Sequence, residues 1–338
     1  MKAIKFFAIS AMAAAMITSC STDDELSQSN YPSDNIIRVT AGVNNAKTRA
    51  DGQGVSAMDK DFSLTVVNKN TESTLPSKYT YIDKVFSKKS GDWACSETLL
   101  WQNSTTPVDI VAFAPAQENK FSGVCDNDRN IKPITYSVAG DQSTWSDNND
   151  LLYYYAKDFK PGEGLKDKKL SIQFNHAFCM IDINVTLGTE FNKPNVLDDS
   201  PIVKVTLGGT KIEANVNVTN AASVVTASGE AADITTTKGS FTPAENADKK
   251  ADPEANAISR FSCIAIPQKV GANTFKVSLM TAGKLYEWTS AEPVELKSGY
   301  RYTLKLSMGN DVVLLKGGSI SATPWTEGDT GDKPLETD

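Results

Sequence analysis

Most segments of this chain that look ordered alternate apolar and polar residues with a period of two. The alternation is clear in FSLTVV at 62–67, IVKVTL at 202–207, TFKVSLM at 274–280 and YRYTLKL at 300–306. This period places successive side chains on opposite faces of an extended strand, so one face can be buried while the other meets solvent. Short strands of this kind, separated by turn residues, predict an all-β protein built from β-sandwiches.

One segment changes its alternation partway along. In LSIQFNHAFCMIDINVTL, at 170–187, apolar residues occupy even positions before His176 and odd positions after Met180. A β-bulge adds one residue to a strand and so reverses the face that each following side chain takes. The pattern therefore predicts one long strand with a bulge between these two residues.

The amino terminus has the features of a secretion signal. Two lysines precede an apolar run at 6–17, which is too short to span a hydrocarbon core of about 30 Å. The sequence ITSC at 17–20 follows and resembles a bacterial lipobox, whose cysteine is acylated. We therefore predict a lipoprotein signal peptide at 1–19 and a lipid anchor for the outer membrane on Cys20. The alternative is an ordinary secretory signal followed by an incidental cysteine.

Acidic residues come directly after this cysteine. Asp23, Asp24 and Glu25 resemble the export tag of surface lipoproteins in Bacteroides-type bacteria, although a solvated leader would carry the same residues. We expect residues 20–35 to form an acidic, lipidated leader on a protein that faces outward from the cell.

The balance of charge limits the partners of the chain. It has 34 basic and 41 acidic residues and a net charge of −7, and removal of the signal peptide would take away two lysines. Nucleic-acid binding requires clustered Lys and Arg side chains, and the sequence has no basic stripe of this kind. No nucleic acid is expected as a partner.

The remaining length corresponds to about two domains. The segment KPGEGLKDKK at 160–169 is polar, charged and glycine-containing, and it divides the mature chain nearly in half. We interpret it as a linker. The expected domains are an N-terminal sandwich at 36–165 and a C-terminal sandwich at 166–338.

Four cysteines remain after the signal peptide, and their spacing is unlike that of a zinc site. In an exported protein Cys95 could pair with Cys125, and Cys179 with Cys263, which would give one disulfide to each half of the chain. The alternative is four thiols that pack as small hydrophobic side chains.

The sequence offers little for catalysis. HExxH, Walker and GxGxxG motifs are absent, and the one histidine, His176, lies within a strand pattern that suits a structural role. The segment DNDRNI at 126–131 begins like a calcium loop, but Ile131 replaces the glycine that such a loop needs. A glycosidase needs only two carboxylates, and nothing singles out such a pair. We expect no enzyme activity, no metal and no cofactor.

The five tryptophans fall into two groups. Trp93, Trp101 and Trp288 lie in or beside apolar strand-like segments and are expected in the core. Trp145 and Trp325 lie in polar surroundings and are expected to be exposed. An exposed indole can stack on a sugar, so Trp145 is the candidate contact for a glycan.

Several stretches, taken in order with the lipobox, resemble a known family. They are LWQNSTTPVDIVAFAP at 100–115, DLLYYYAKD at 150–158, FNHAFCMIDINV at 174–185, CIAIPQ at 263–268, LKSGYRYTLKL at 296–306 and GSISATPWTEGD at 318–329. Together they resemble the fimbrillin family of fimbrial subunits of Bacteroides-type bacteria. The resemblance implies two transthyretin-like β-sandwich domains in tandem. It also implies a structural subunit of a cell-surface fimbria, or pilus, that associates with other fimbrial subunits and supports adhesion without catalysis.

The resemblance further implies maturation by an Arg-specific protease in a loop after the first strand. The segment NNAKTRADGQG at 44–54 places Arg49 among small and polar residues, and accessible backbone is what a protease needs. A surface loop that merely contains an arginine would have the same composition. The sequence favours Arg49 as the processing site.

A cut there would remove the first predicted strand, NIIRVTAGV at 35–43. Its apolar face carries Ile37, Val39 and Val43 together with an alanine. Loss of this face and of its backbone pairing would cost on the order of 10 kcal/mol, comparable with the stability of a domain. A strand from another subunit could fill the vacancy by β-augmentation, so assembly would wait for proteolysis.

The donor strand is expected near the carboxyl terminus. The segment at 311–325 supplies enough apolar residues, and the candidates are Val312, Val313, Leu314, Leu315 and Ile320. Stalk, tip and anchor positions in a fibre are all compatible with the sequence. The alternative function is a monomeric surface lipoprotein that binds glycans or host ligands.

Overall fold

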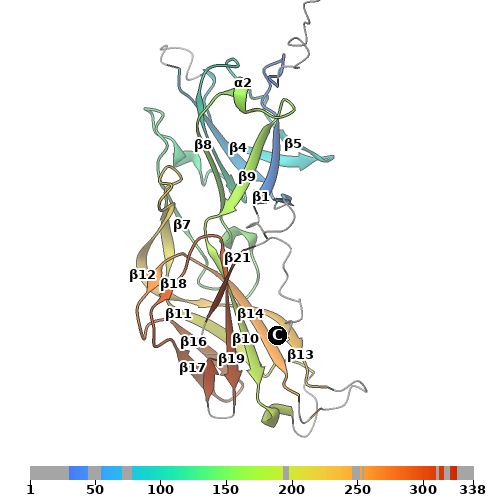
Figure 1. The fold of residues 1–338 in the computed structure, drawn as a ribbon, viewed down its shortest axis with the longest axis vertical. Coiled ribbons are helices and arrows are strands. Elements are labelled where there is room, and N and C mark those ends of the chain that lie inside the picture. Colours follow the sequence, from blue (N-terminus) through green and yellow to red (C-terminus); the bar gives the residue numbers. More distant parts are fainter. Residues whose placement is uncertain are drawn as a thin grey trace, which may run out of the picture.

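The structure, a computed structural model, consists almost entirely of strands, which confirms the all-β prediction. It describes residues 30–44, 55–70, 78–192, 198–245, 252, 255–309, 312–315 and 320–325. Two β-sandwiches follow one another along the long axis of the molecule (Figure 1). Within the described residues, no helix has the length and apolar character needed to cross a bilayer.

The first sandwich is formed by one sheet of eight strands. Its order is β2-β1-β9-β8-β6-β3-β4-β5. Phe62 of β3 meets Phe174 of β9 with their ring centroids 5.5 Å apart. In a flat sheet strands three places apart would lie about 14 Å from each other, so the sheet must curl around its own interior. The strands are β1 Val39–Asn44, β2 Val55–Ala57, β3 Phe62–Asn68, β4 Tyr81–Lys89, β5 Asp92–Cys95, β6 Val108–Ala114, β8 Leu152–Phe159 and β9 Leu170–His176.

The second sandwich packs a six-stranded sheet against a five-stranded one. The first has the order β13-β14-β10-β19-β20, with β21 also paired to β19, and the second has the order β12-β11-β16-β17, with β7 also paired to β11. Strands β15 and β18 form a separate pair. The bounds are β7 Ile134–Ser137, β10 Cys179–Leu187, β11 Ile202–Val216, β12 Val225–Thr235, β13 Thr237–Thr242, β14 Ile258–Ala265, β15 Lys269–Val270, β16 Lys276–Thr281, β17 Leu285–Thr289, β18 Val294–Glu295, β19 Tyr300–Met308, β20 Val313–Leu315 and β21 Ser321–Pro324.

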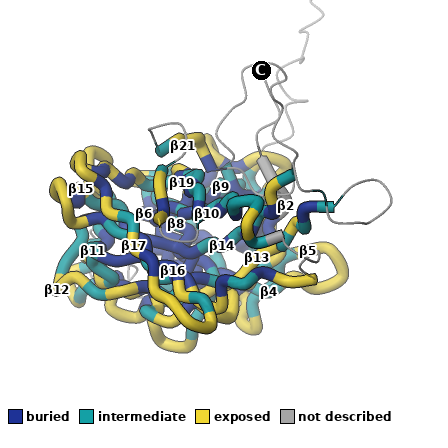
Figure 2. The backbone as a smooth tube through the Cα atoms, turned by 90° about the horizontal axis from the view of Figure 1, so that it is seen from below, coloured by how far each residue is buried: buried dark blue, intermediate teal, exposed yellow. Residues whose placement is uncertain are grey.

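Helical structure in the described residues is confined to short turns. These are the 3-10 helices η1 Ser122–Val124, η2 Asp147–Asn149 and η3 Thr189–Asn192, and the α-helix α2 Pro161–Gly164. Seen along the long axis, buried segments gather toward the middle of the molecule and exposed segments lie mainly at its outside (Figure 2).

The change of alternation at 176–180 marks a crossing between the sandwiches. Strand β9 ends at His176 in the eight-stranded sheet, and β10 begins at Cys179 in the six-stranded sheet. The prediction of one long strand with a bulge is therefore wrong. The apolar face changes because the chain leaves one core and enters another, where Phe178 is fully buried.

The predicted division at 165 and 166 also needs correction. Strand β9 lies after that point but pairs with β1 and β8 in the first sandwich. Strand β7 lies before it but pairs with β11 in the second. The polar segment at 160–169 therefore connects β8 to β9 within one sheet, and its turn is closed by the bridge between Lys166 and Lys169.

A row of aromatic rings joins the two sandwiches. Strands β3 and β6 are buried on both faces, and Phe113 of β6 points away from the interior of the first sandwich. Its ring stacks on Phe121 at 4.7 Å, and the row continues through Tyr136 to Phe178. Residues before β8 thus complete the core of the second sandwich, which explains why no clean boundary exists.

The four described cysteines are free thiols, so the disulfide alternative is wrong. Cys95 packs against the core of the first sandwich, whereas Cys125 belongs to the core of the second. Cys179 and Cys263 are buried in one sheet, and the Cys179 thiol donates to the carbonyl of Ala265 at 3.2 Å. Burial raises the pKa of both thiols, which keeps them protonated.

We expect a thiol reductant to leave the melting temperature of the folded domains unchanged, because no disulfide contributes to them. Thermal unfolding followed by circular dichroism, with and without reductant, measures this. Alkylation in denaturant without prior reduction should modify Cys95, Cys125, Cys179 and Cys263. A disulfide-linked peptide in the mass spectrum would contradict the assignment.

Candidate functional site

The first strand is an interior strand of its sheet. Strand β1 runs parallel to β9, in register from Val39 opposite Leu170 to Val43 opposite Phe174, and antiparallel to β2 on its other side (Figure 1). Ahead of the strand the chain pairs with a different segment, because the Ile37 amide donates to the carbonyl of Leu99 at 2.9 Å. The segment is therefore held along both edges.

The apolar face of this segment points into the core of the first sandwich. Ile37, Val39 and Val43 are buried there, and Ala41 is half-buried against the same cluster. The opposite face carries Arg38, whose guanidinium binds Asp34 and holds the pKa of that exposed carboxyl well below its usual range. The alternation read from the sequence thus matches the burial of the strand.

The two modification sites predicted at this end of the chain cannot be placed. Cys20 and Arg49 lie outside the described residues. The described chain stops at Asn44, the last residue of β1, and resumes at Val55, the first of β2. Arg49 therefore belongs to the connection between two strands that pair with each other.

The candidate donor segment lies at the edge of the second sandwich. Strands β20 and β21 both pair antiparallel with β19, from Met308 opposite Val313 and from Tyr300 opposite Pro324. Val313 is buried, while Leu315 and Ile320 are half-buried against the core. Val312 and Leu314 are exposed, and 58% of the surface of Leu314 is accessible. The segment is apolar, as predicted, but only part of it is buried.

The end of this segment is fixed to the junction between the sandwiches. The Trp325 indole stacks on the imidazole of His176, with centroids 3.8 Å apart and planes 15° from parallel. The Trp325 amide donates to the carbonyl of Gly299 at 2.8 Å. Only 6% of Trp325 is exposed, so its prediction as a surface residue is wrong. Its polar sequence neighbours gave no indication of a partner so distant in the chain.

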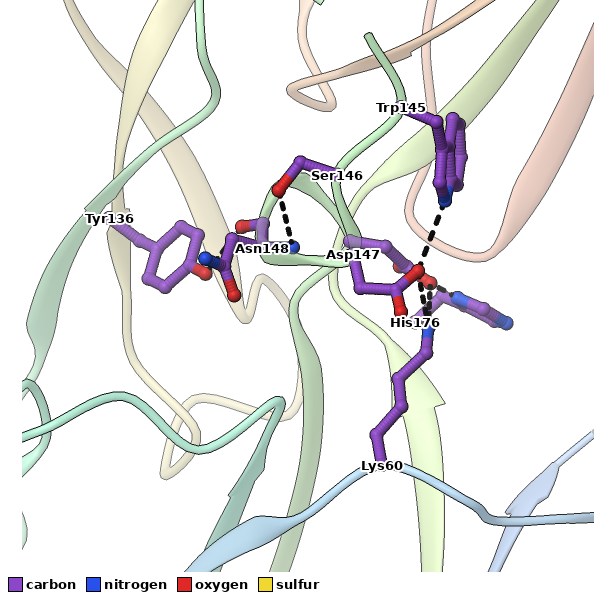
Figure 3. A network of polar contacts seen from close by, with 8 residues as sticks. Lys60, Tyr136, Trp145, Ser146, Asp147, Asn148 and His176 are labelled. Carbon is purple, nitrogen blue, oxygen red and sulfur yellow. Dashed lines mark hydrogen bonds and ion pairs between the residues drawn. The ribbon is translucent and has the colours of Figure 1, made fainter.

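A polar network surrounds the same histidine (Figure 3). The Nδ1 atom of His176 lies 2.9 Å from Oδ1 of the buried Asp150, which requires the tautomer that donates from Nδ1 when the ring is neutral. Lys60 lies 3.9 Å from Asp150 and 3.5 Å from Asp147, and Asp147 accepts a hydrogen bond from the Trp145 indole at 3.0 Å. These contacts connect the first sandwich with the loop that leads to η2.

This arrangement suits a structural function. The side chain of His176 is 1% exposed and one face of its ring is covered by Trp325, so a substrate cannot reach it. The structural role predicted for this histidine is confirmed.

Trp145 is 41% exposed, as expected. Trp101 is buried, and Trp93 and Trp288 pack at the edges of the two cores. Within the described chain, no group of His, Cys, Asp and Glu could hold a metal ion.

The fold and these contacts define a structural β-sandwich protein with an interior first strand and a C-terminal segment at a sheet edge. Comparison with known families agrees, because the model of the family described as fimbrillin-like matches residues 48–325. The chain belongs to the fimbrillin-like family. Membership makes it a fimbrial subunit of the cell-surface fimbrium that associates with other such subunits, and it confirms that the chain is not an enzyme.

Solved structures show the same fold at low sequence identity. A candidate cell adhesion protein of Bacteroides ovatus is 16% identical, with a TM-score of 0.58 over 87% of this chain and 99% of the other. A second one, from Bacteroides uniformis, is 14% identical, with a TM-score of 0.55 over 87% and 100%. A fimbrial protein of Bacteroides vulgatus is 14% identical, with a TM-score of 0.51 over 87% and 99%. No curated protein matches the sequence.

We expect Trp325→Ala to lower the free energy of unfolding by about 3 kcal/mol, because it removes a buried indole and its stack on His176. Trp325→Phe keeps a ring and should lose less. Trp145→Ala is the matched control and should cost under about 1 kcal/mol, since that residue is 41% exposed and lies outside both cores. Urea unfolding measures all three, and equal losses for the two alanine variants would contradict the assignment.

Proposed function

We propose that this chain is exported as a lipoprotein anchored to the outer membrane through Cys20, and that it assembles by donor-strand exchange after an Arg-specific protease cuts at Arg49. The supporting observation is the position of β1, which fills the core of the first sandwich and lies directly before the segment that contains Arg49. Cleavage there would separate β1 and the lipidated leader from the rest of the molecule.

Removal of β1 would create a vacancy of defined shape. The three buried aliphatic side chains Ile37, Val39 and Val43 contribute about 5–9 kcal/mol of burial. Strand β2 follows Arg49 and stays with the cleaved protein, so the vacancy lies between β9 and β2. Both neighbours would then present unpaired backbone groups, and an incoming strand could hydrogen-bond along both of its edges.

The C-terminal segment is the donor that we favour. Val313, Leu315 and Ile320 are apolar side chains that pack partly on the second core, as a strand that enters an apolar groove requires. Strands β20 and β21 pair only with β19 in the described chain, so their release breaks one set of backbone hydrogen bonds. The donor of one subunit would then fill the vacancy of the next.

A second function is supported by a separate observation. The Trp145 indole is exposed, and its orientation is fixed by the hydrogen bond to Asp147. An exposed, oriented aromatic ring suits contact with a glycan. On this alternative the chain keeps β1 and acts as a monomeric surface lipoprotein that binds glycans or host ligands.

Replacement of Arg49 tests the proteolytic switch. The Arg49→Ala protein should stay uncleaved and form no fibres, while the wild-type protein should begin at Ala50 after assembly. N-terminal sequencing and electron microscopy of surface-extracted material measure both. Lys47→Ala is the matched control two residues earlier in the sequence and should assemble normally. Normal fibres from Arg49→Ala would show that the switch does not operate.

A synthetic strand tests the vacancy itself. A peptide of residues 35–44, added to cleaved subunits, should occupy the space between β9 and β2 and prevent polymerisation. The same peptide with Val39→Asp and Val43→Asp should fail, because both positions are buried in the first core and a carboxylate there would lose its hydration. Size-exclusion chromatography follows the loss of polymer. Equal inhibition by the two peptides would contradict the proposed site.

A further inference from the structure

A pocket of about 680 Å³ opens in the second sandwich beside the candidate donor segment. One wall comes from β17, the loop at 290–293 and β18, and the other comes from β19, β20 and β21. Its volume falls within the range that small-molecule sites occupy in proteins. The space is therefore large enough for a ligand of several rings.

Aromatic side chains form much of the lining. The Trp288 ring packs edge-on against the buried Phe275, with centroids 6.4 Å apart, which fixes its orientation. Tyr300 is 37% exposed, and its ring centroid lies 6.5 Å from that of Tyr302. Trp288 and the buried Tyr302 are packed before a ligand arrives, so they lose little conformational freedom on binding. They offer flat apolar faces at the pocket.

Polar groups stand beside these rings. Glu292, Glu295 and Lys297 line the pocket and are exposed, and the last two form an ion pair at 3.5 Å. The hydroxyl of Tyr302 accepts a hydrogen bond from the Lys297 amide at 2.8 Å. Burial raises the pKa of Tyr302 to about 12, so the hydroxyl keeps a proton that it can donate.

We propose that this pocket binds a short oligosaccharide without negative charge. Sugar rings have apolar C–H faces that can lie against Trp288 and Tyr300, and hydroxyls that can donate to the carboxylate of Glu292. Two carboxylates against one ammonium disfavour an anionic sugar. An extended peptide fits less well, because the edge of β19 beside the pocket is already paired with β20 and β21.

The site is composite. Leu315, Ile320 and Ala322 belong to the candidate donor segment and form part of the wall. This inference rests on the proposed function in one respect, because the donor segment that forms part of the wall is the one proposed to leave during strand exchange. If the segment leaves to fill a neighbouring subunit, the wall leaves with it, so the pocket is complete only in a subunit that retains its own β20 and β21.

Binding should be measured on the full mature protein carrying Arg49→Ala, which keeps β1 in place and does not require assembly. The probes are maltotriose and N-acetylchitotriose, with 3′-sialyllactose as the anionic comparison, and isothermal titration calorimetry gives the affinity. At least one neutral probe should bind more tightly than sialyllactose. Tyr300→Ala should weaken that binding about tenfold, and Glu292→Gln should also weaken it, without change in melting temperature.

The matched control is Val203→Ala, which trims an exposed apolar side chain outside this pocket and should leave the affinity unchanged. Binding of neither neutral probe, stronger binding of sialyllactose, or an affinity that Tyr300→Ala does not alter would each overturn the proposal. So would binding of the peptide 35–44 that Tyr300→Ala abolishes, since the pocket would then be a peptide site. Fibre formation by cleaved wild-type protein is scored separately, so failure of the pocket and failure of strand exchange can be distinguished.

Discussion

Two parallel strand pairs along one continuous segment organise the molecule. Strand β9 pairs in parallel with β1, and β10, which follows it after two residues, pairs in parallel with β19. The first pair lies in one sandwich and the second in the other, so residues 170–187 pass through both (Figure 1). The removable strand of the proposed mechanism lies on the first half of this segment. Strand β19, with which the candidate donor segment pairs, is the neighbour of the second half.

The distribution of buried side chains determines what the loss of β1 would disturb. Ile37, Val39 and Val43 belong to the core inside the first sandwich, whereas the row from Phe113 to Phe178 belongs to the core of the second. Vacating β1 would therefore remove buried side chains from the first core and none from the second, although β6 of the first sheet also contributes Phe113 to the second core. Regions with separate cores can open at different free energies. The second sandwich can stay folded while the first waits for a strand.

The sequence predicted local structure well and long-range arrangement poorly, and the cause is physical. A period of two shows which face of a strand is buried, and it gave the buried face of β1 and that of β19 from Tyr302 onward. At the start of β19 it failed, because Tyr300 is exposed and Arg301 is buried. It does not show which core the strand faces, so the crossing at Ala177 looked like a bulge. Trp325 was misjudged for a related reason, because its stacking partner His176 is remote in the chain and no local pattern indicates it.

The two ends of the chain are held by interactions of different kinds. Strand β1 has a neighbour on each side and three buried aliphatic side chains. The C-terminal segment has β19 on one side, exposes Val312 and Leu314, and relies on Trp325 for its contact with the junction. Spontaneous departure of β1 would break two ladders at once, whereas departure of the C-terminal segment breaks one ladder, one ring stack and the packing of Val313 on the second core. This asymmetry explains why, under the proposed mechanism, a protease acts at the first strand and no cut is needed at the donor.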